Sequence, residues 1–293
     1  PDFAEVHSNL GGILKDLGKL EEAELSYRKA IEIKPDFAEV HSNLGGLMRD
    51  LGKLEEAELS YLKAIKIKPS YAEAYCNLGI ILKALGKLKG AELSYRKAIQ
   101  LSPNLVDAHY NLGNVLNSLG KLKEGEKSIV QCLELNENHL QAKLILSAIR
   151  LHQGNNSLLN KLLQSNQSNN PFLTSLKWIS SLSKIPEVFF NRLDFYDAII
   201  KQSLKNRPFY EFGVYQGSSF KYLIKTFKKG YGFDTFEGLP EKWGRFEKGA
   251  FSTQGTIPKV NGGTFIAGIF EDTLPTFFSK SRPLASIINF DAD

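Results

Sequence analysis

Residues 35–68 read PDFAEVHSNLGGLMRDLGKLEEAELSYLKAIKIK, and this stretch recurs with few changes on both sides. A proline returns every 34 residues, at Pro1, Pro35, Pro69 and Pro103. Each copy contains an Asn-Leu-Gly run and, further on, a Leu-Gly-Lys-Leu turn. A 34-residue period with one turn in each copy is typical of stacked helix pairs. The sequence therefore predicts an α-solenoid of tetratricopeptide helix pairs.

Small and large side chains at fixed positions predict how the two helices of each pair pack. A glycine closes the Asn-Leu-Gly run of the first helix, at Gly11, Gly45, Gly79 and Gly113. The second helix offers a small alanine (Ala23, Ala57, Ala91) and then a bulky tyrosine (Tyr27, Tyr61, Tyr95). We expect the glycines to let the paired helix approach closely, and each proline to end its unit because it cannot continue a helix.

The repeat pattern decays toward the C-terminal end of the array. Four consensus positions change in the fourth unit, to Gly125, Ile129, Cys132 and Glu137. A faint fifth unit remains in residues 141–170, and decay of this kind is typical of a capping unit. We expect four repeats over residues 1–136, a degenerate fifth repeat and linker over 137–170, and a helical lead-in over 171–207.

Length and composition indicate two domains and argue against several partner classes. The chain has 293 residues, of which 42% are hydrophobic, and a formal net charge of +5. Basic and acidic residues interleave along the helix faces, which is typical of a solvated surface and not of nucleic-acid binding. No apolar run approaches the roughly 18 residues of a membrane span. The two cysteines, Cys76 and Cys132, give no disulfide framework, so we expect a cytoplasmic protein.

Residues 208–241 carry a different pattern, of the kind that binds nucleotides. A short β-rich run over 209–213 stops at a glycine turn, Gly213-Val-Tyr-Gln-Gly217, and an amphipathic segment follows over 218–227. A second strand over 231–233 ends on Asp234. Glycines let the backbone approach a ligand closely, and an acid after the second strand suits a pair of ribose hydroxyls.

Four blocks of this region resemble class I S-adenosylmethionine-dependent methyltransferases, most closely the macrocin O-methyltransferase (TylF-like) family of sugar O-methyltransferases. The blocks are EFGVYQGSSF (211–220), DTFEGLPE (234–241), GIFEDTLP (268–275) and FDAD (290–293). The resemblance implies a partial α/β doubly wound, Rossmann-like methyltransferase domain over residues 208–293. It also implies S-adenosylmethionine as the cofactor and a hydroxyl of a sugar or similar polyol as the methyl acceptor.

The same resemblance assigns roles in cofactor binding to eight residues: Glu211, Gly213, Tyr215, Gly217, Ser218, Asp234, Phe236 and Phe270. Glu211 would orient the methionine moiety, or it is a strand-end acid in a local salt bridge. Asp234 would hold the ribose. Glu271 and Asp272 would contact the adenine edge, or Asp272 would cap a helix that begins near Thr273.

In the resembled family, the acid of the FDAD motif binds Mg²⁺ and takes part in deprotonating the sugar hydroxyl. We assign Asp291 as the catalytic and metal-binding acid and Asp293 as the second choice of metal ligand, because hard carboxylate oxygens suit Mg²⁺. The chain begins inside a repeat unit and ends inside a strand-like run. We therefore expect a piece of a longer protein, with enzymatic activity only in the full-length parent.

One asparagine recurs on the same face of successive first helices, at Asn9, Asn43, Asn77 and Asn111. The array resembles the superhelix of O-GlcNAc transferase, whose matching asparagines line an inner groove and hold peptide backbone. An amide side chain can donate and accept a hydrogen bond at once. Two interpretations stay open: the row binds a protein or peptide partner, or it is inherited consensus that satisfies neighbouring backbone.

A histidine also recurs, at His7, His41 and His109, where the third unit has Tyr75. Interchange with an aromatic side chain favours a packing role over metal binding.

Two functions follow from these patterns. The first is an S-adenosylmethionine-dependent O-methyltransferase with a tetratricopeptide array for protein interaction. The alternative is a non-enzymatic tetratricopeptide scaffold with a degenerate nucleotide-binding domain.

Overall fold

The computed structural model describes residues 3–165, 170–182, 192–238, 249 and 252–290. The chain divides into two compact units, Pro1–Asn191 and Arg192–Asp293. Each unit is described by itself.

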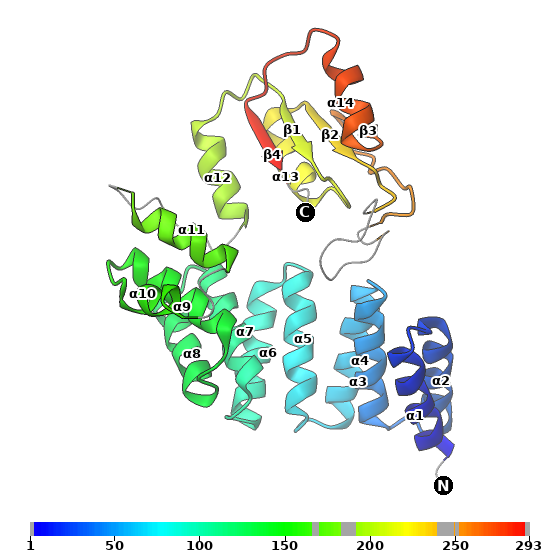
Figure 1. Cartoon of the computed structure of the whole chain (residues 1–293). Helices are drawn as coiled ribbons and strands as arrows, with labels where there is room; N and C mark the ends of the chain where they lie inside the picture. The colour runs from blue at the N-terminus through cyan, green and yellow to red at the C-terminus, as the bar shows by residue number, and fades with distance from the viewer. Residues whose placement is uncertain (1–2, 166–169, 183–191, 239–248, 250–251, 291–293) are drawn as a thin grey trace. The chain divides into compact units, whose positions relative to one another are not determined.

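The first unit is a row of paired helices (Figure 1). The pairs are α1 (Phe3–Asp16) with α2 (Leu20–Ile33), α3 (Ala38–Asp50) with α4 (Leu54–Ile67), α5 (Ala72–Ala84) with α6 (Leu88–Leu101), and α7 (Val106–Ser118) with α8 (Leu122–Leu135). A shorter pair follows, α9 (Leu140–His152) with α10 (Ser157–Leu163), and then α11 (Pro171–Ser180). The second helix of each pair also packs against the first helix of the next. Every described element of this unit is helical, which confirms the predicted solenoid.

Close packing of glycine against tyrosine holds each pair together. A methyl group added at Gly11 would lie 2.7 Å from the ring of Tyr27, and one added at Gly79 would lie 2.6 Å from the ring of Tyr95. The tyrosine rings are buried between the helices. The predicted close approach at the glycine is therefore confirmed.

The fourth pair, α7 with α8, replaces this contact by a different one. Ile129 is fully buried and takes the place of the tyrosine, 2.6 Å from a methyl group added at Gly113. At Gly125, where the other units have alanine, the Asn117 amide fills the space of the missing methyl group. Asn117 is only 4% exposed, and neither amide atom has a hydrogen-bond partner among the residues described. A buried, unsatisfied amide is destabilising, so this pair departs from the consensus at an energetic cost.

Adjacent glycines of α1 provide a matched pair of variants. Gly11→Ala should destabilise the protein by about 1–3 kcal/mol, because the new methyl group would collide with the buried Tyr27 ring. Gly12→Ala should be neutral or stabilising by up to about 1 kcal/mol, because its nearest neighbour is 3.8 Å away and alanine is the better helix former. Urea unfolding of both variants checks this. Equal losses would show that the Gly11 contact does not control the pairing.

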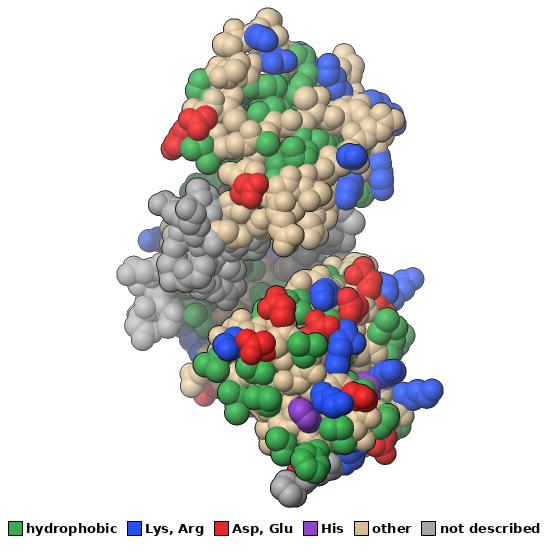
Figure 2. Space-filling model, turned by 90° about the vertical axis from the view of Figure 1, so that its right-hand side faces the viewer, with side chains coloured by type: hydrophobic (Ala, Val, Ile, Leu, Met, Phe, Trp, Pro, Cys, Tyr) green, Lys and Arg blue, Asp and Glu red, His purple; other side chains and the backbone are tan. Residues whose placement is uncertain are grey.

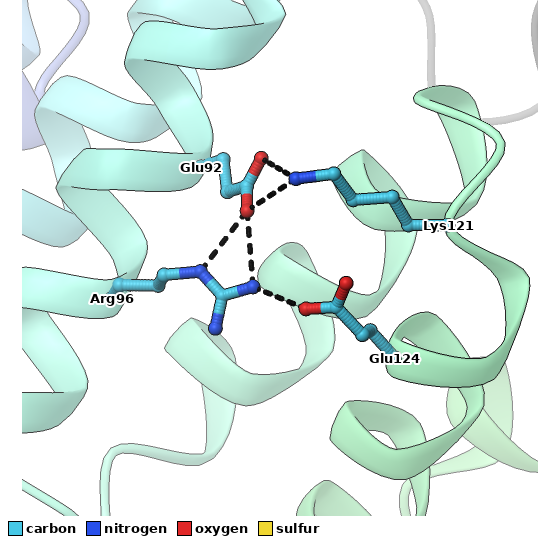
Figure 3. A network of polar contacts seen from close by, with 4 residues as sticks. All are labelled: Glu92, Arg96, Lys121 and Glu124. Atoms are coloured by element: carbon cyan, nitrogen blue, oxygen red, sulfur yellow. Dashed lines mark hydrogen bonds and ion pairs between the residues drawn. The ribbon is translucent and has the colours of Figure 1, made fainter.

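A repeated ion pair joins the second helix of each of the first three pairs to the next unit. The pairs are Lys53 Nζ to Glu24 at 3.4 Å, Lys87 Nζ to Glu58 at 2.6 Å, and Lys121 Nζ to Glu92 at 2.9 Å. At the junction between the third and fourth pairs, Arg96 bridges Glu92 (3.0 Å) and Glu124 (2.6 Å), which gives the four-residue network of Figure 3. The 34-residue period therefore fixes polar contacts between units as well as the apolar core.

Glu92 is the acid on which this network converges, and it is largely buried. Burial alone would raise the pKa of Glu92. Hydrogen bonds from Lys121 and Arg96, together with the positive charges of both, outweigh burial and hold the pKa below its usual range. Glu24, which faces Arg28 and Lys53, has a lowered pKa for the same opposing reasons.

Stability should depend on pH in the acid range. A lowered carboxyl pKa contributes stability above the unfolded-state value of about 4.3, and this contribution is lost as pH falls through the folded-state pKa. Glu92→Gln should cost about 1–2 kcal/mol at pH 7 and flatten this decline, since the charged hydrogen bonds are lost. Glu32→Gln is the control, because the Glu32–Lys29 pair is exposed and screened by solvent, so its loss should change the unfolding curve much less. If both variants unfold alike across pH 3–7, the network does not stabilise the junction.

The second unit is a small parallel sheet with helices on both faces. Its elements are α12 (Arg192–Gln202), β1 (Phe209–Phe212), α13 (Ser218–Phe227), β2 (Gly230–Asp234), β3 (Gly263–Ala267), α14 (Phe270–Phe278) and β4 (Ile287–Phe290). The strand order is β3-β2-β1-β4, and every neighbouring pair is parallel. The chain moves outward from β1 to β3 on one side and returns to place β4 on the other. The strand order therefore reverses between β1 and β4.

Alternation along β1 divides the core of this unit into two layers. Phe209 packs with residues of α12 and α13, including Tyr196 and Phe220. Tyr210 and the other side chains of its face pack toward α14, against Phe277. The strands predicted over 209–213 and 231–233 are confirmed as β1 and β2.

The structure corrects one prediction at the start of α14. The helix begins at Phe270, and its N-cap is Ile269, which makes no side-chain cap. Asp272 therefore lies inside the first turn and does not cap a helix that begins near Thr273. A carboxylate in the first turn still interacts favourably with the positive end of the helix dipole.

None of the described helices is long and apolar enough to cross a membrane.

Candidate functional sites

The glycine turn after β1 and the end of β2 are joined through one carboxylate. Asp234 accepts hydrogen bonds from the N–H of Tyr215 at 2.7 Å and from the N–H of Phe236 at 2.8 Å. Both donors have left-handed backbone, with φ of 48° at Tyr215 and 60° at Phe236. Gly213 (φ 80°) and Gly217 (φ 72°) bracket the turn in the same left-handed region, where glycine is favoured. Asp234 thus brings the two predicted motifs together and fixes the turn.

Glu211 lies beneath this turn and is fully buried. Its carboxylate accepts a hydrogen bond from the Ser219 hydroxyl, in the first turn of α13. The acid therefore ties β1 to the start of the following helix. Sequence reasoning missed Ser219; the signal was the second serine of Gly-Ser-Ser, one residue into the amphipathic segment and on its buried side.

The other predicted cofactor residues have different surroundings. Ser218 is the first residue of α13 and is exposed. Phe236 is 1% exposed and packs in the core near Phe265, so its side chain faces other apolar groups. Phe270 packs edge-on against Phe212, with 5.6 Å between ring centroids. Asp291 and Asp293 lie outside the described residues.

The Asp234 contacts predict a local change that can be measured without any ligand. Asp234→Ala removes both acceptors, so the amides of Tyr215 and Phe236 should exchange with solvent at least about ten-fold faster. Asp234→Asn keeps one carbonyl acceptor and should release one amide more than the other. Hydrogen exchange followed by NMR resolves the two amides, with Glu237→Gln as the control at an exposed acid nearby. Unchanged exchange in Asp234→Ala would show that the acid does not hold the turn.

The asparagine row crosses four neighbouring first helices. Asn9, Asn43, Asn77 and Asn111 lie on α1, α3, α5 and α7, which contact one another in that order. Asn9 and Asn43 are exposed, and Asn77 and Asn111 are half-buried. That the four amides line one side of the array stays a prediction.

Asn111 has one side-chain partner in the neighbouring unit, the thiol of Cys76. Burial, followed by the nearby carboxylates of Asp107 and Glu73, raises the pKa of Cys76 to about 12. The hydrogen bond with Asn111 acts in the opposite direction and lowers this pKa, so the Asn111 amide is the donor to the sulfur. Sulfur is a weak acceptor, so the remaining capacity of the amide is available to a stronger partner.

The recurring histidines pack against their own repeat. The Nε2–H of His41 donates to the Pro35 carbonyl at 2.9 Å, and that of His109 donates to the Pro103 carbonyl at 2.8 Å. Both imidazoles are buried. Within the described part of the chain, no group of three or more His, Cys, Asp or Glu side chains is arranged to hold a metal ion.

Comparison with known proteins identifies the repeats. Residues 11–48, 47–86 and 79–120 match the family model of the TPR repeat, and residues 106–139 match that of the tetratricopeptide repeat. This part of the chain is a tetratricopeptide repeat array. No match was found among curated proteins.

Several solved structures share the fold of the array. YrrB is 22% identical, with a TM-score of 0.51, over 59% of this chain and 90% of YrrB. A tetratricopeptide repeat protein from Parabacteroides merdae is 24% identical, with a TM-score of 0.54, over 60% of this chain and 72% of that protein. MamA from Desulfovibrio magneticus RS-1 is 18% identical, with a TM-score of 0.53, over 58% of this chain and 98% of the compared MamA chain.

Proposed function

We propose that the first unit is a protein-interaction scaffold that binds an extended segment of a partner protein along the asparagine row. The observation that supports it is the recurrence of one amide on four helices that lie side by side. An extended peptide presents N–H and C=O groups that need partners, and an amide side chain supplies both an acceptor and a donor. A row of amides therefore suits peptide backbone and leaves the choice of peptide sequence to neighbouring side chains.

A solved structure with the same fold also supports a peptide as the partner. YrrB is described as a TPR protein with an unusual peptide-binding site. We infer the same class of ligand, a peptide, for this array, but not the same binding site.

Paired variants test the proposed peptide site. Linear peptides selected from a random display library on the intact protein should lose at least about ten-fold in affinity in Asn43→Ala/Asn77→Ala, since each lost backbone hydrogen bond costs about 0.5–1.5 kcal/mol. Asn160→Ala, at an exposed asparagine of α10, is the matched control and should bind normally. Selected peptides that bind the double variant as tightly as the native protein would remove the row from the site.

We also propose that the second unit binds S-adenosylmethionine and belongs to a methyltransferase. The supporting observation is the hydrogen bond from the glycine turn after β1 to Asp234 at the end of β2. In open parallel sheets, ligands bind outside the carboxyl ends of the strands, near the point where the strand order reverses. Here that point lies between β1 and β4.

The residues present fit such a cofactor. Each oxygen of Asp234 accepts one backbone N–H, and a carboxylate oxygen has a second lone pair that a ribose hydroxyl can use. The turn at Gly213–Gly217 allows close approach of the backbone, and the exposed Ser218 opens α13, whose N–H groups favour a polar or anionic group. S-adenosylmethionine supplies the methyl group when bound; the protein binds and orients it. A sugar or polyol acceptor, and Mg²⁺ on Asp291 or Asp293, rest on the family resemblance.

Calorimetry with S-adenosylmethionine tests the second proposal. Asp234→Asn should weaken binding by about 1.5–3 kcal/mol, the usual worth of a hydrogen bond to a charged group, while Glu237→Gln should bind as the native protein does. Folding of each variant is checked by circular dichroism. Native protein that is folded and binds no S-adenosylmethionine would favour the scaffold with a degenerate nucleotide-binding domain.

A further inference from the structure

The first helix of the array exposes an apolar face. Val6, Leu10 and Ile13 are 50%, 42% and 59% exposed. They follow one another at three- and four-residue spacing, so they form one stripe along α1. Phe3 and Leu17 extend the stripe at its two ends and are also largely exposed.

The same repeat positions are buried in every later unit. Val40 and Leu47, which correspond to Val6 and Ile13, are fully buried. The third and fourth units behave alike, with buried side chains at Ala74, Leu78, Ile81, Ala108, Leu112 and Val115. In each of these units, the preceding second helix packs on the first helix: α2 on α3, α4 on α5 and α6 on α7. The stripe on α1 therefore has the composition of a helix face that is normally covered by the second helix of a neighbouring pair.

Charged residues at the α1 end of the array also indicate that the stripe fits the second helix of a neighbouring pair. Lys53, Lys87 and Lys121 each reach back to a glutamate of the preceding second helix. The equivalent Lys19 instead pairs with Glu22 of its own helix at 3.2 Å, and both side chains are more than half exposed. Lys19 therefore occupies the same repeat position as Lys53, Lys87 and Lys121, but it pairs within its own unit and not with a neighbouring one.

Two further junction contacts define what the occupant should carry. Asp50 accepts from Lys15 of the preceding first helix at 3.0 Å, and Asp16 is its exposed equivalent. Glu124 binds Arg96 of the preceding second helix at 2.6 Å, and Glu22 is its equivalent. A complementary surface would thus offer a cation to Asp16, a glutamate to Lys19 and an arginine to Glu22.

Figure 2 looks onto this end of the array. Hydrophobic side chains gather there, with Lys, Arg, Asp and Glu side chains among and around them. A mixed surface of this kind matches the junctions inside the array, where apolar burial is framed by ion pairs.

We propose that the Val6–Leu10–Ile13 face is an interaction surface for the second helix of another tetratricopeptide helix pair of this same repeat type. The pair docks as α2 docks on α3, with its own lysine at Asp16, its glutamate at Lys19 and its arginine at Glu22. Asn9 lies beside the stripe on α1 but is not part of it, so the proposal does not depend on peptide binding.

A fusion supplies the occupant directly. A second copy of residues 1–34, joined in front of Pro1 of the whole chain, carries the required lysine, glutamate and arginine at its positions 15, 24 and 28. The α1 amides of the original chain should then exchange at least about ten-fold more slowly, because a stacked neighbour stabilises a repeat. Val6→Asp/Ile13→Lys should abolish this gain in the fusion. The same two substitutions should leave the unfused chain almost unchanged, since both positions face solvent there.

Leu25→Lys is the matched control. Leu25 is 70% exposed on α2 and lies outside the stripe, so its substitution should leave the gain in the fusion intact. A fusion that gives no added protection would overturn the proposal. Analytical ultracentrifugation gives a second outcome that would overturn it: the unfused chain dimerises, and Val6→Asp/Ile13→Lys dissociates the dimer. In that case the face would bind a second copy of this chain.

Discussion

The close contact between a glycine on one helix and a tyrosine on its partner sets the geometry of the array. Without a side chain at Gly11 or Gly79, the tyrosine ring packs directly on helix backbone. The helix spacing within each pair follows from this contact, and so does the position of every residue that faces outward. The asparagine row lies two residues before the same glycines, so its regular course across four helices depends on the buried packing behind it.

Junctions between pairs repeat as regularly as the pairs themselves. Apolar burial between neighbouring helices provides most of the cohesion, and ion pairs such as Lys121–Glu92 add register, because only one stacking places each lysine on its glutamate. Since each unit contacts mainly its neighbours, a binding surface made by several first helices is extended along the stack. Such a surface suits a partner segment that is itself extended.

Much of this structure could be predicted from sequence, because repetition averages out local ambiguity. Four copies fix the helix pairs, and the glycine–tyrosine contact follows from side-chain size. In the second unit, the strands before Gly213 and at Asp234 were also predicted, since each ends at a turn. Asp272 was misplaced because Ile269 starts α14 without a polar cap, and the preference for acidic caps is only statistical. The Asn117 amide and the Glu211–Ser219 bond were missed, because both depend on tertiary contacts that no local pattern records.

The glycine turn shows why a sequence motif is stronger evidence for a fold than for a chemical activity. Asp234 accepts hydrogen bonds from the N–H groups of Tyr215 and Phe236, and Glu211 accepts one from Ser219, so both acids stabilise the local structure. Selection for the fold alone would keep them in an enzyme and in a scaffold alike. Ser218 is different, because it is exposed at the start of α13 and is not one of the buried residues of the core. Such a residue lies at the carboxyl edge of the sheet, where ligands bind, and takes no part in packing. Its identity therefore distinguishes a functional cofactor site from a domain that has kept only the fold.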